Sequence, residues 1–174
     1  ARFRSMRIIT LNANGIRSAA GKGLFDWFKR QRADVLCLQE TRAEREQLVD
    51  AHYFPRGWHV HYHVARSKRG YSGVAIYVRR EPDAVFDTLG WAPFDEEGRY
   101  LELRFGQLSV VSLYLPSGSS SEERQAFKYR VLEWLTPKLA EWRASGREYV
   151  LCGDWNIAHR PIDLRNWRAN QKNS

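Results

Sequence analysis

Cysteine is scarce in this sequence: only Cys37 and Cys152 occur among its 174 residues. Both lie in apolar, strand-like runs, which favours buried and reduced thiols over a disulfide or a zinc site. Long apolar runs are lacking too, since no stretch approaches the roughly 20 residues that span a bilayer, and the N-terminus has no apolar core of a signal peptide. We therefore predict a soluble, cytoplasmic protein without a membrane partner.

Internal repeats, low-complexity stretches and linkers are also lacking, so the chain is predicted to form one domain over residues 1–174. Its composition, 43% apolar and 13% aromatic, excludes a disordered chain. Basic residues outnumber acidic ones, 28 to 20, which gives a net charge of +8. Such an excess favours a polyanionic partner, although charge alone fits RNA, DNA and an acidic membrane surface equally.

The segment from Leu151 to Ala158 is the most informative part of the sequence. A short apolar strand, predicted over residues 149–152, ends at Gly153 and is followed at once by Asp154 and Asn156. Residues two apart in a strand share a face, so a carboxylate and an amide can converge on one ligand atom. Such a pair can position a water molecule and bind an oxyanion. The alternative is an Asx turn, in which both side chains bond only the local backbone.

A second acid, Glu40, follows another apolar run, from Val35 to Leu38. In open α/β sheets, ligands bind in the crevice beyond the carboxyl ends of the strands. A glutamate at such a position that lacks a basic partner is a hard oxygen ligand suited to Mg²⁺ or Mn²⁺. The alternative is a solvated loop acid that pairs with Arg42.

A third strand-like run, residues 7–11, ends in Asn12-Ala13-Asn14-Gly15. Asn14-Gly15 is a strong turn dipeptide, so turn chemistry accounts for Asn14. Asn12 has no such explanation, and it again lies where a strand ends. Three strand ends with polar side chains predict one convergent polar site rather than three unrelated loops.

The rest of the sequence alternates helices and strands in the manner of an α/β protein. Helices are predicted over residues 23–30, 44–49 and 120–144, and strands over residues 59–64, 73–78, 100–105 and 108–115. In the longest helix, Ser120 and Glu123 are predicted to form a capping box, and Pro137 is expected to kink or divide the helix.

Three histidines, His59, His61 and His63, share one face of the first of these strands. Cysteine or carboxylate partners at a matching spacing are absent from the sequence. We therefore interpret this face as solvated rather than metal-binding.

Six short segments then stand out along the chain: Leu-Asn-Ala-Asn-Gly-Ile-Arg (11–17), Leu-Gln-Glu-Thr-Arg (38–42), Gly-Tyr-Ser-Gly-Val-Ala (70–75), Glu-Gly-Arg-Tyr (97–100), Tyr-Leu-Pro-Ser-Gly (114–118) and Gly-Asp-Trp-Asn-Ile-Ala (153–158). In this order they resemble the motifs of the exonuclease III family of DNA-repair nucleases. The resemblance extends from Met6 to Ser174. It implies the α/β fold of the endonuclease/exonuclease/phosphatase superfamily, a four-layer α/β/β/α sandwich similar to deoxyribonuclease I.

The resemblance also implies a role for each motif residue. Glu40 would coordinate Mg²⁺ or Mn²⁺, and Asn12 would hold the hydrogen-bond network of the metal site. Asp154 would orient or deprotonate the attacking water. Asn156 and the hydroxyl of Tyr114 would bond phosphate oxygens as charge builds on them. For Tyr114, the alternative is a tyrosine at the edge of the core.

Three further motif residues match DNA-binding positions of the family: Gly70 and Tyr71 in one loop, and Arg99 in another. Contacts of this kind position a duplex on its backbone without reading its sequence. The alternatives are an exposed loop aromatic for Tyr71 and a surface ion pair with Glu97 for Arg99.

One family motif, a Ser-Asp-His sequence whose histidine completes the site, does not occur in this sequence. Family members also continue beyond the region that resembles this chain. We therefore expect residues 1–174 to be a C-terminally incomplete, N-terminal part of the sandwich that does not cleave DNA efficiently by itself. The complete enzyme is expected to be a monomer.

The predicted function is that of a metal-dependent DNA-repair phosphodiesterase that acts on double-stranded DNA at abasic sites and at recessed 3′ ends. Its expected activities are abasic-site incision, 3′-exonuclease and 3′-phosphatase activity. Two alternatives remain. One is a fold-related phosphatase for a small phosphoester such as a phosphoinositide, against which the Gly70-Tyr71 loop and the basic charge argue. The other is an inactive, DNA-binding fragment.

Overall fold

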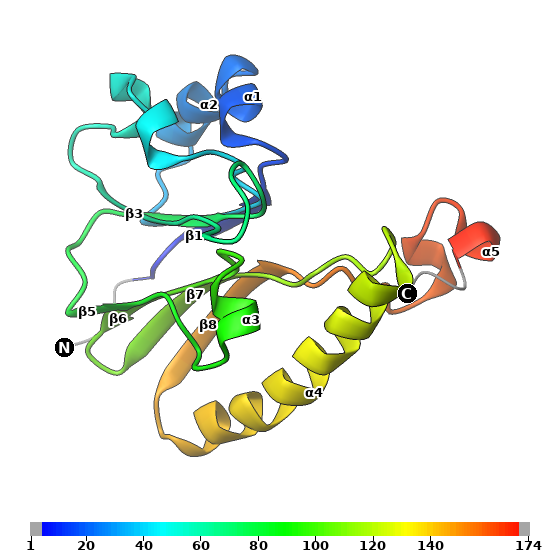
Figure 1. Cartoon of the computed structure of the whole chain (residues 1–174). Coiled ribbons are helices and arrows are strands. Elements are labelled where there is room, and N and C mark those ends of the chain that lie inside the picture. Colours follow the sequence, from blue (N-terminus) through cyan, green and yellow to red (C-terminus); the bar gives the residue numbers. More distant parts are fainter. Residues whose placement is uncertain (1–4, 171–174) are drawn as a thin grey trace. The chain divides into compact units, whose positions relative to one another are not determined.

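The computed structural model of the chain describes residues 5–170 as a mixed α/β protein (Figure 1). Within these residues, eight strands form two four-stranded sheets. Sheet A has the order β1-β2-β4-β3 and consists of β1 (Ile8–Asn12), β2 (Val35–Gln39), β3 (His59–His63) and β4 (Val74–Val78). Sheet B has the order β5-β6-β7-β8 and consists of β5 (Ala84–Phe86), β6 (Tyr100–Phe105), β7 (Leu108–Tyr114) and β8 (Glu148–Asp154). The predicted α/β fold with two sheets is confirmed.

The helices lie between these strands in the sequence or follow the last strand, β8. They are α1 (Ile16–Gly21), α2 (Leu24–Arg30), α3 (Ala92–Asp95), α4 (Glu122–Ala144) and α5 (Trp167–Asn170), with 3₁₀ turns η1 (Arg45–Gln47), η2 (Ala51–Tyr53) and η3 (Pro161–Asp163). The helix predicted over residues 44–49 is thus only the short turn η1, which is too brief for an α-helix.

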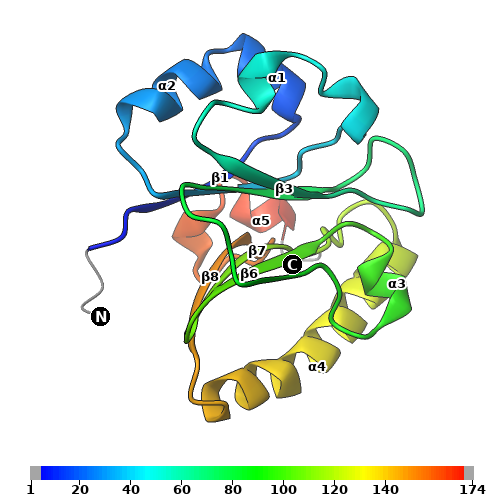
Figure 2. The ribbon, with the colours of Figure 1, turned by 90° about the vertical axis from the view of Figure 1, so that its left-hand side faces the viewer.

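Strand β2 is buried along its whole length, and each of its faces packs against a different layer. Leu36 and Leu38 join an apolar cluster with residues of α1 and α2, which lie on one side of sheet A (Figure 2). Val35 and Cys37 point to the opposite face, because successive side chains of a strand alternate, and join a cluster with residues of β6 and β7. The first unit of the chain therefore stacks helices, sheet A and sheet B in that order.

The register of sheet A determines which loops meet at its edge. Strands β1 and β2 are parallel, with Asn12 opposite Gln39. Strand β4 is antiparallel to β2 and begins at Val74, which is also opposite Gln39. The segments that follow β1 and β2 and the segment that precedes β4 therefore emerge at the same edge.

Both cysteines are buried in the cluster between the sheets, as predicted. A hydrogen bond with Cys152, together with burial, raises the pKa of the Cys37 thiol well above its ordinary value. The Cys37 thiol therefore stays protonated and packs as a small apolar group.

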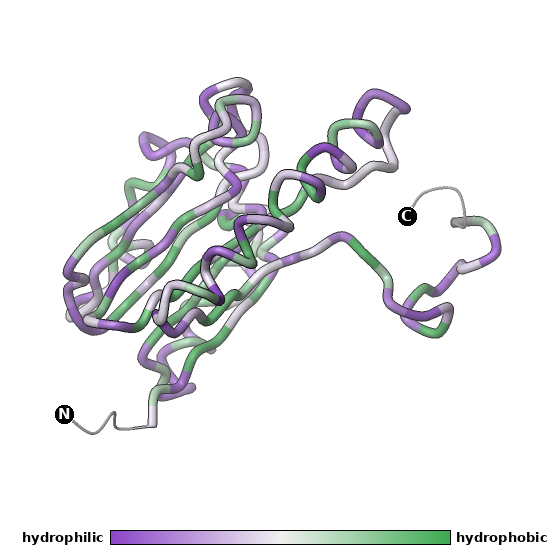
Figure 3. Tube along the Cα trace, turned by 90° about the horizontal axis from the view of Figure 1, so that it is seen from below, coloured by the Kyte–Doolittle hydropathy of each residue, from purple (hydrophilic) through white to green (hydrophobic). Residues whose placement is uncertain are grey.

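Helix α4 begins at Glu122, two residues later than predicted, and is not divided. Its N-cap is Ser121, whose side chain accepts a hydrogen bond from the backbone of Arg124 at 3.1 Å, so the predicted Ser120–Glu123 capping box is wrong. Pro137 lies inside the helix. Proline has no N–H, so one backbone carbonyl of the helix lacks its usual donor. Because Pro137 is exposed, water can donate a hydrogen bond to that carbonyl instead. Apolar and polar residues are interspersed along this helix (Figure 3).

The histidine-bearing strand β3 is less solvated than predicted. His59 is exposed, but His63 is buried and donates from Nδ1 to the carbonyl oxygen of Tyr100 at 2.8 Å. Burial, with a smaller effect of His59, lowers the pKa of His61. The prediction of a solvated face is therefore wrong for His63, because its ring satisfies a backbone carbonyl of β6.

The chain divides into two compact units, which we describe separately. The first unit comprises residues 1–114 and 147–153, and the second comprises residues 115–146 and 154–174. The single domain expected over residues 1–174 stays a prediction. No helix within residues 5–170 is long and apolar enough to cross a membrane.

Sheet B contains a buried carboxylate, Glu102, that three side chains satisfy. Tyr100 donates to Oε2 at 2.5 Å, and Arg104 and Ser109 each donate to Oε1 at 2.7 Å. Burial alone would raise the pKa of Glu102, but these hydrogen bonds outweigh it, so that the pKa lies below its ordinary value. The ionised carboxylate thus stabilises the folded chain above the ordinary glutamate pKa, and this contribution is lost as the pH falls through the lowered pKa.

We predict that Glu102→Gln lowers the free energy of unfolding at pH 7 by about 1–3 kcal/mol, the cost of a buried hydrogen-bond network left incomplete. Urea denaturation measures this change in the free energy of unfolding. The exposed Glu133→Gln is the control for the loss of one negative charge. As the pH falls from the ordinary glutamate pKa through the lowered pKa of Glu102, the difference between the wild type and Glu102→Gln should shrink, because the carboxylate of Glu102 becomes protonated. Equal stability of the wild type and Glu102→Gln at pH 7 would show that the network contributes nothing.

Candidate active site

Glu40 lies directly after β2, at the edge of sheet A where β1 also ends. Backbone hydrogen bonds fix its position from two sides. Its carbonyl accepts from the N–H of Gly15 at 2.8 Å, and the N–H of Thr41 donates to the carbonyl of Gly73 at 3.1 Å. With only 8% of the residue exposed, the carboxylate is held in one place rather than solvated in a loop.

Glu40 has a basic partner, contrary to the prediction. The guanidinium of Arg42 pairs with Oε1 of Glu40. Both residues have left-handed backbones, with φ of 57° and 49°. The pairing foreseen in the alternative thus occurs, but on a buried carboxylate. Among residues 5–170, Arg42 is the only side-chain partner of Glu40.

Asn12 is likewise engaged in turn chemistry, contrary to the prediction. Its Oδ1 accepts a hydrogen bond from the backbone N–H of Asn14 at 2.9 Å. Asn14 has a φ of 44°, as an Asn-Gly turn favours. Asn12 therefore orders the loop that runs past Glu40, and the carbonyl of Gln39 accepts from Ala13 at 2.8 Å on the other side of the same turn.

Left-handed backbone is concentrated in the segments that resemble family motifs. Six residues other than glycine have positive φ within residues 5–170, and five of them lie in these segments: Asn14, Glu40, Arg42, Ser72 and Asn156. This conformation is disfavoured for residues with a Cβ and persists only where the surroundings impose it. Such strain clusters at functional sites, which supports a functional role for these loops.

A buried arginine joins two of the predicted tyrosines. The guanidinium of Arg99 donates to the hydroxyl of Tyr71 at 3.0 Å and to the carbonyl of Tyr114 at 3.0 Å. It also lies over both rings, 5.5 Å from the centroid of Tyr71 and 4.9 Å from that of Tyr114. Lys68 lies 5.6 Å from the Tyr71 ring. The guanidinium of Arg99 therefore positions both tyrosines.

The ion pair between Arg99 and Glu97 occurs, but it is not on the surface. Nε of Arg99 donates to Glu97 at 2.6 Å, and only 1% of Arg99 is exposed. An arginine so enclosed cannot reach a DNA phosphate unless its surroundings move. The expected direct contact of Arg99 with DNA stays a prediction, and the structure gives this residue a second role, which is to hold Tyr71.

The loop that carries Gly70 and Tyr71 rests against Gly98. The carbonyl of Gly98 accepts from the N–H of Gly73 at 3.0 Å and from the hydroxyl of Ser72 at 3.3 Å. Gly98 has a φ of 62°, and a Cβ there would lie 2.6 Å from the backbone nitrogen of Ala65, so no other residue fits. The Gly70 N–H donates to Glu44 at 2.8 Å. Tyr71 thus belongs to a fixed loop and is only half-buried.

In the second unit, Asp154 and Asn156 form an Asx turn. Oδ1 of Asp154 accepts from the N–H of Asn156 at 3.0 Å, and the side-chain amide of Asn156 donates to the carbonyl of Leu115 at 2.7 Å. The period-two geometry predicted for this pair is wrong, because Asn156 lies beyond β8 with a φ of 49°. The local bonds of the alternative exist, and they fix the orientation of both side chains.

Lys128, which no sequence motif singled out, supports this turn. Lys128 is one of the buried residues of α4, together with Phe127 and Val131, and it is only 2% exposed. Its ammonium group donates to the carbonyl of Asn156 at 2.7 Å. Burial lowers the pKa of Lys128. The available signal was the spacing of Lys128 from Val131 and Leu135, three and seven residues on, which places a lysine on the same helix face as two apolar residues.

The residues around Glu40 fit one kind of metal site. Residues 5–170 contain no group of three or more His, Cys, Asp or Glu side chains that could hold a metal ion. The described residues thus form no closed site of the zinc or calcium type. Mg²⁺, by contrast, is often bound through one or two carboxylates, with water and substrate phosphates completing its shell. A single, buried and fixed carboxylate is compatible with such an open site.

The structure therefore brings most of the predicted site residues into one unit. Asn12, Glu40, Gly70, Tyr71, Arg99 and Tyr114 all belong to the first unit, on segments connected by backbone hydrogen bonds. Asp154 and Asn156 belong to the second unit, where they are fixed by each other and by Lys128. That Asp154 and Asn156 converge with Glu40 on one site stays a prediction.

We predict that Lys128→Met loosens the Asp154–Asn156 turn, because the carbonyl of Asn156 loses its donor. Amide hydrogen exchange of the Asn156 N–H should accelerate about tenfold, which corresponds to the roughly 1.4 kcal/mol of one charge-assisted hydrogen bond. Lys138→Met, on the same helix but half-exposed, is the control and should leave this exchange rate unchanged. Unaltered protection of Asn156 in Lys128→Met would rule out the supporting role.

Comparison with known proteins identifies the family of this chain. The model of the endonuclease/exonuclease/phosphatase family matches residues 9–174. An exodeoxyribonuclease of Bacillus subtilis is 36% identical over 97% of this chain and 66% of its own length. A DNA-(apurinic or apyrimidinic site) endonuclease of Dictyostelium discoideum is 31% identical over 97% of this chain and 46% of its own length.

A solved structure of an AP endonuclease from Archaeoglobus fulgidus matches the fold with a TM-score of 0.77 and 30% identity, over 96% of this chain and 63% of its own length. The chain thus spans about half to two-thirds of the length of these three relatives. Because the family model covers nearly all of the sequence, the chain belongs to the endonuclease/exonuclease/phosphatase family.

Proposed function

We propose that this chain carries much of the phosphodiesterase site of a metal-dependent DNA-repair nuclease of the exonuclease III type. Its substrate is double-stranded DNA with abasic sites or recessed 3′ ends. The observation that carries the proposal is the carboxylate of Glu40, which is buried and fixed by backbone bonds at the edge of sheet A. The named relatives, an exodeoxyribonuclease and abasic-site endonucleases, favour DNA over a small phosphoester.

We assign the metal site to Glu40. Bound there, Mg²⁺ or Mn²⁺ would polarise the scissile phosphate and stabilise the leaving oxygen. Arg42, on Oε1, leaves the other carboxylate oxygen for this purpose. Asn12 uses its Oδ1 on Asn14, so its part is to order the adjacent loop rather than to supply that oxygen as a ligand.

We propose that Asp154 orients or deprotonates the attacking water. The Asx turn with Asn156 occupies Oδ1 of Asp154 and thereby sets the direction of the carboxylate. Asn156 donates one amide hydrogen to Leu115, and an amide group has a second hydrogen that can bond a phosphate oxygen. The hydroxyl of Tyr114 is assigned the same task, with its ring fixed by Arg99. Neutral donors of this kind stabilise charge that develops in the transition state.

We propose that the loop of Gly70 and Tyr71 contacts the DNA backbone. Arg99 fixes the Tyr71 hydroxyl, and Lys68 adds a positive charge near the ring. The net charge of +8 favours the approach of a polyanion. Contacts of this type hold a duplex in register without selecting its sequence.

The activity itself is tested with the natural protein on three substrates: a labelled duplex with one abasic site, a duplex with a recessed 3′ end, and a phosphoinositide. We expect Mg²⁺-dependent cleavage of the DNA substrates. Hydrolysis of the phosphoinositide alone would reject the nuclease assignment.

We predict that Glu40→Gln raises the Mg²⁺ concentration needed for half-maximal cleavage of the abasic duplex by about tenfold or more, the scale of a lost metal-site partner. Glutamine keeps the shape of the side chain and an oxygen for Arg42, so circular dichroism should report an unchanged fold. Glu46→Gln, an exposed site in the following turn, is the matched control. An unchanged metal dependence would make Glu40 a bystander.

A second prediction concerns Asp154→Asn in the natural protein. Asparagine retains the Oδ1 acceptor of the Asx turn and removes the basic carboxylate, so cleavage should fall by roughly 100-fold or more while DNA binding persists. Asp163→Asn is the matched control, because Asp163 also accepts a backbone N–H, from Arg160 at 2.8 Å, on the exposed surface. Near-normal turnover of Asp154→Asn would exclude its proposed role.

A further inference from the structure

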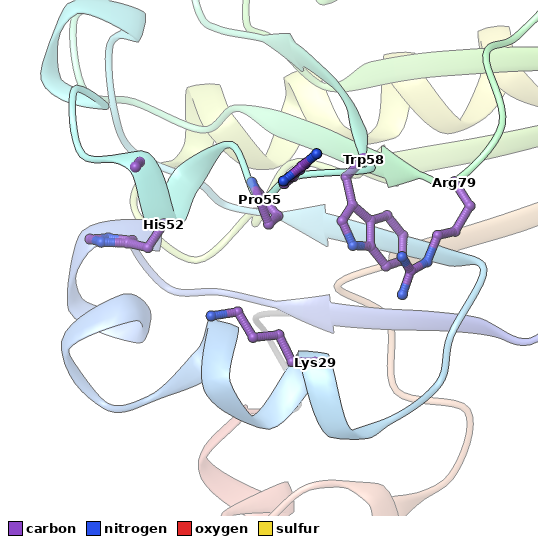
Figure 4. A pocket seen from close by; sticks show the side chains of 7 residues that line it. Lys29, His52, Pro55, Trp58 and Arg79 are labelled. Carbon is purple, nitrogen blue, oxygen red and sulfur yellow. The ribbon is translucent and has the colours of Figure 1, made fainter.

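A second feature of the first unit, apart from the candidate site, is a cavity of about 540 Å³ with basic walls. Its lining includes Lys29 of α2, His52 of η2, Arg56, Trp58 and Arg79 (Figure 4). We call this cavity the basic pocket. No acidic residue contributes to its lining among the residues that the structure describes.

The basic pocket lies at the end of sheet A that is opposite to Glu40. Arg79 follows Val78, which pairs with Val35 at the start of β2 and with His59 at the start of β3. Glu40 follows the other end of β2. Five strand residues at about 3.3 Å each separate the two ends, roughly 15 Å or more. The pocket is therefore not part of the candidate active site.

The guanidinium of Arg79 is held in place before any ligand binds. It lies 4.2 Å from the centroid of the Trp58 ring (Figure 4). Phe28 packs against the same indole at 4.6 Å between centroids. The backbone N–H of Arg79 donates to the carbonyl of Asp34 at 3.1 Å. Because Trp58 already contacts both groups, it serves as a platform for Arg79 rather than as a surface on which a base can stack.

The cations of the pocket are poorly neutralised. Arg56 and Arg79 form no ion pair with any residue in the described range 5–170. Lys29 lies 3.7 Å from Asp26, but both side chains are largely exposed, so this pair is weak. Three positive groups around one cavity repel one another, and a bound anion removes that repulsion.

We propose that the basic pocket binds a phosphate group, carried by a nucleotide or by a nucleic-acid strand that does not occupy the Glu40 end of the sheet. Two guanidinium groups and one ammonium match a phosphate, because arginine presents paired donors and lysine adds a point charge. The volume also exceeds the roughly 30 Å³ of one water molecule many times over, which leaves room for the sugar attached to the phosphate. This inference does not depend on the nuclease function.

The test follows the indole N–H resonance of Trp58 by NMR in the natural protein, with inorganic phosphate, 2′-deoxyadenosine 5′-monophosphate and a short single-stranded oligonucleotide as ligands. Uncharged 2′-deoxyadenosine is the ligand control. We expect the phosphate-bearing ligands to shift the resonance and the nucleoside to leave it in place. Tighter binding of the monophosphate than of the oligonucleotide would identify a nucleotide site, and the reverse order would identify a strand site.

The variant is Arg79→Gln, with Arg80→Gln as the matched control, since Arg80 is the exposed neighbour that does not line the cavity. Arg79→Gln should weaken binding of the preferred ligand about tenfold or more, and Arg80→Gln should weaken it much less. Glu40→Gln should bind as the wild type does, which separates this result from a failure of the nuclease assignment. The proposal is overturned if no phosphate-bearing ligand shifts Trp58, or if both arginine variants lose affinity equally.

Discussion

The burial of β2 on both faces is the constraint on which the first unit depends. All five of its residues are buried, and its backbone is bonded to β1 on one side and to β4 on the other. A buried strand must have its backbone groups paired, so the register with both neighbours is fixed. That register places the loop after Asn12, the carboxylate of Glu40 and the loop before Val74 at one edge. The core of the fold thus determines where the polar loops emerge.

A buried charge then organises those loops. The guanidinium of Arg99 is almost fully removed from water, which is tolerable only because Glu97 neutralises it and because Tyr71 and Tyr114 accept its remaining bonds. The partners are consequently as fixed as the arginine. Two tyrosines from segments about forty residues apart in sequence gain a common orientation. At position 98 only glycine fits, and the carbonyl of Gly98 accepts two hydrogen bonds from the same loop.

Arginines lie at both ends of sheet A, but the two ends differ in whether these arginines pair with carboxylates. At the Glu40 end, arginines are paired with carboxylates, Arg42 with Glu40 and Arg99 with Glu97. At the opposite end, Arg56 and Arg79 have no carboxylate partner within residues 5–170. Paired arginines position other groups, whereas unpaired ones attract a ligand. The same sheet therefore carries the proposed active site at one edge and the proposed phosphate-binding pocket at the other.

The sequence by itself determined all the described strands except β5, their polar ends and the family, because apolar runs and turn residues are local signals and the motifs occur in a fixed order. It placed Glu40 at a strand end and the cysteines in the core. Only the tertiary structure decided that Arg42 pairs with Glu40, that Arg99 and His63 are buried, and that Lys128 supports the turn of Asn156. The reason is physical: charged residues are exposed by default, and their burial depends on partners that distant segments supply.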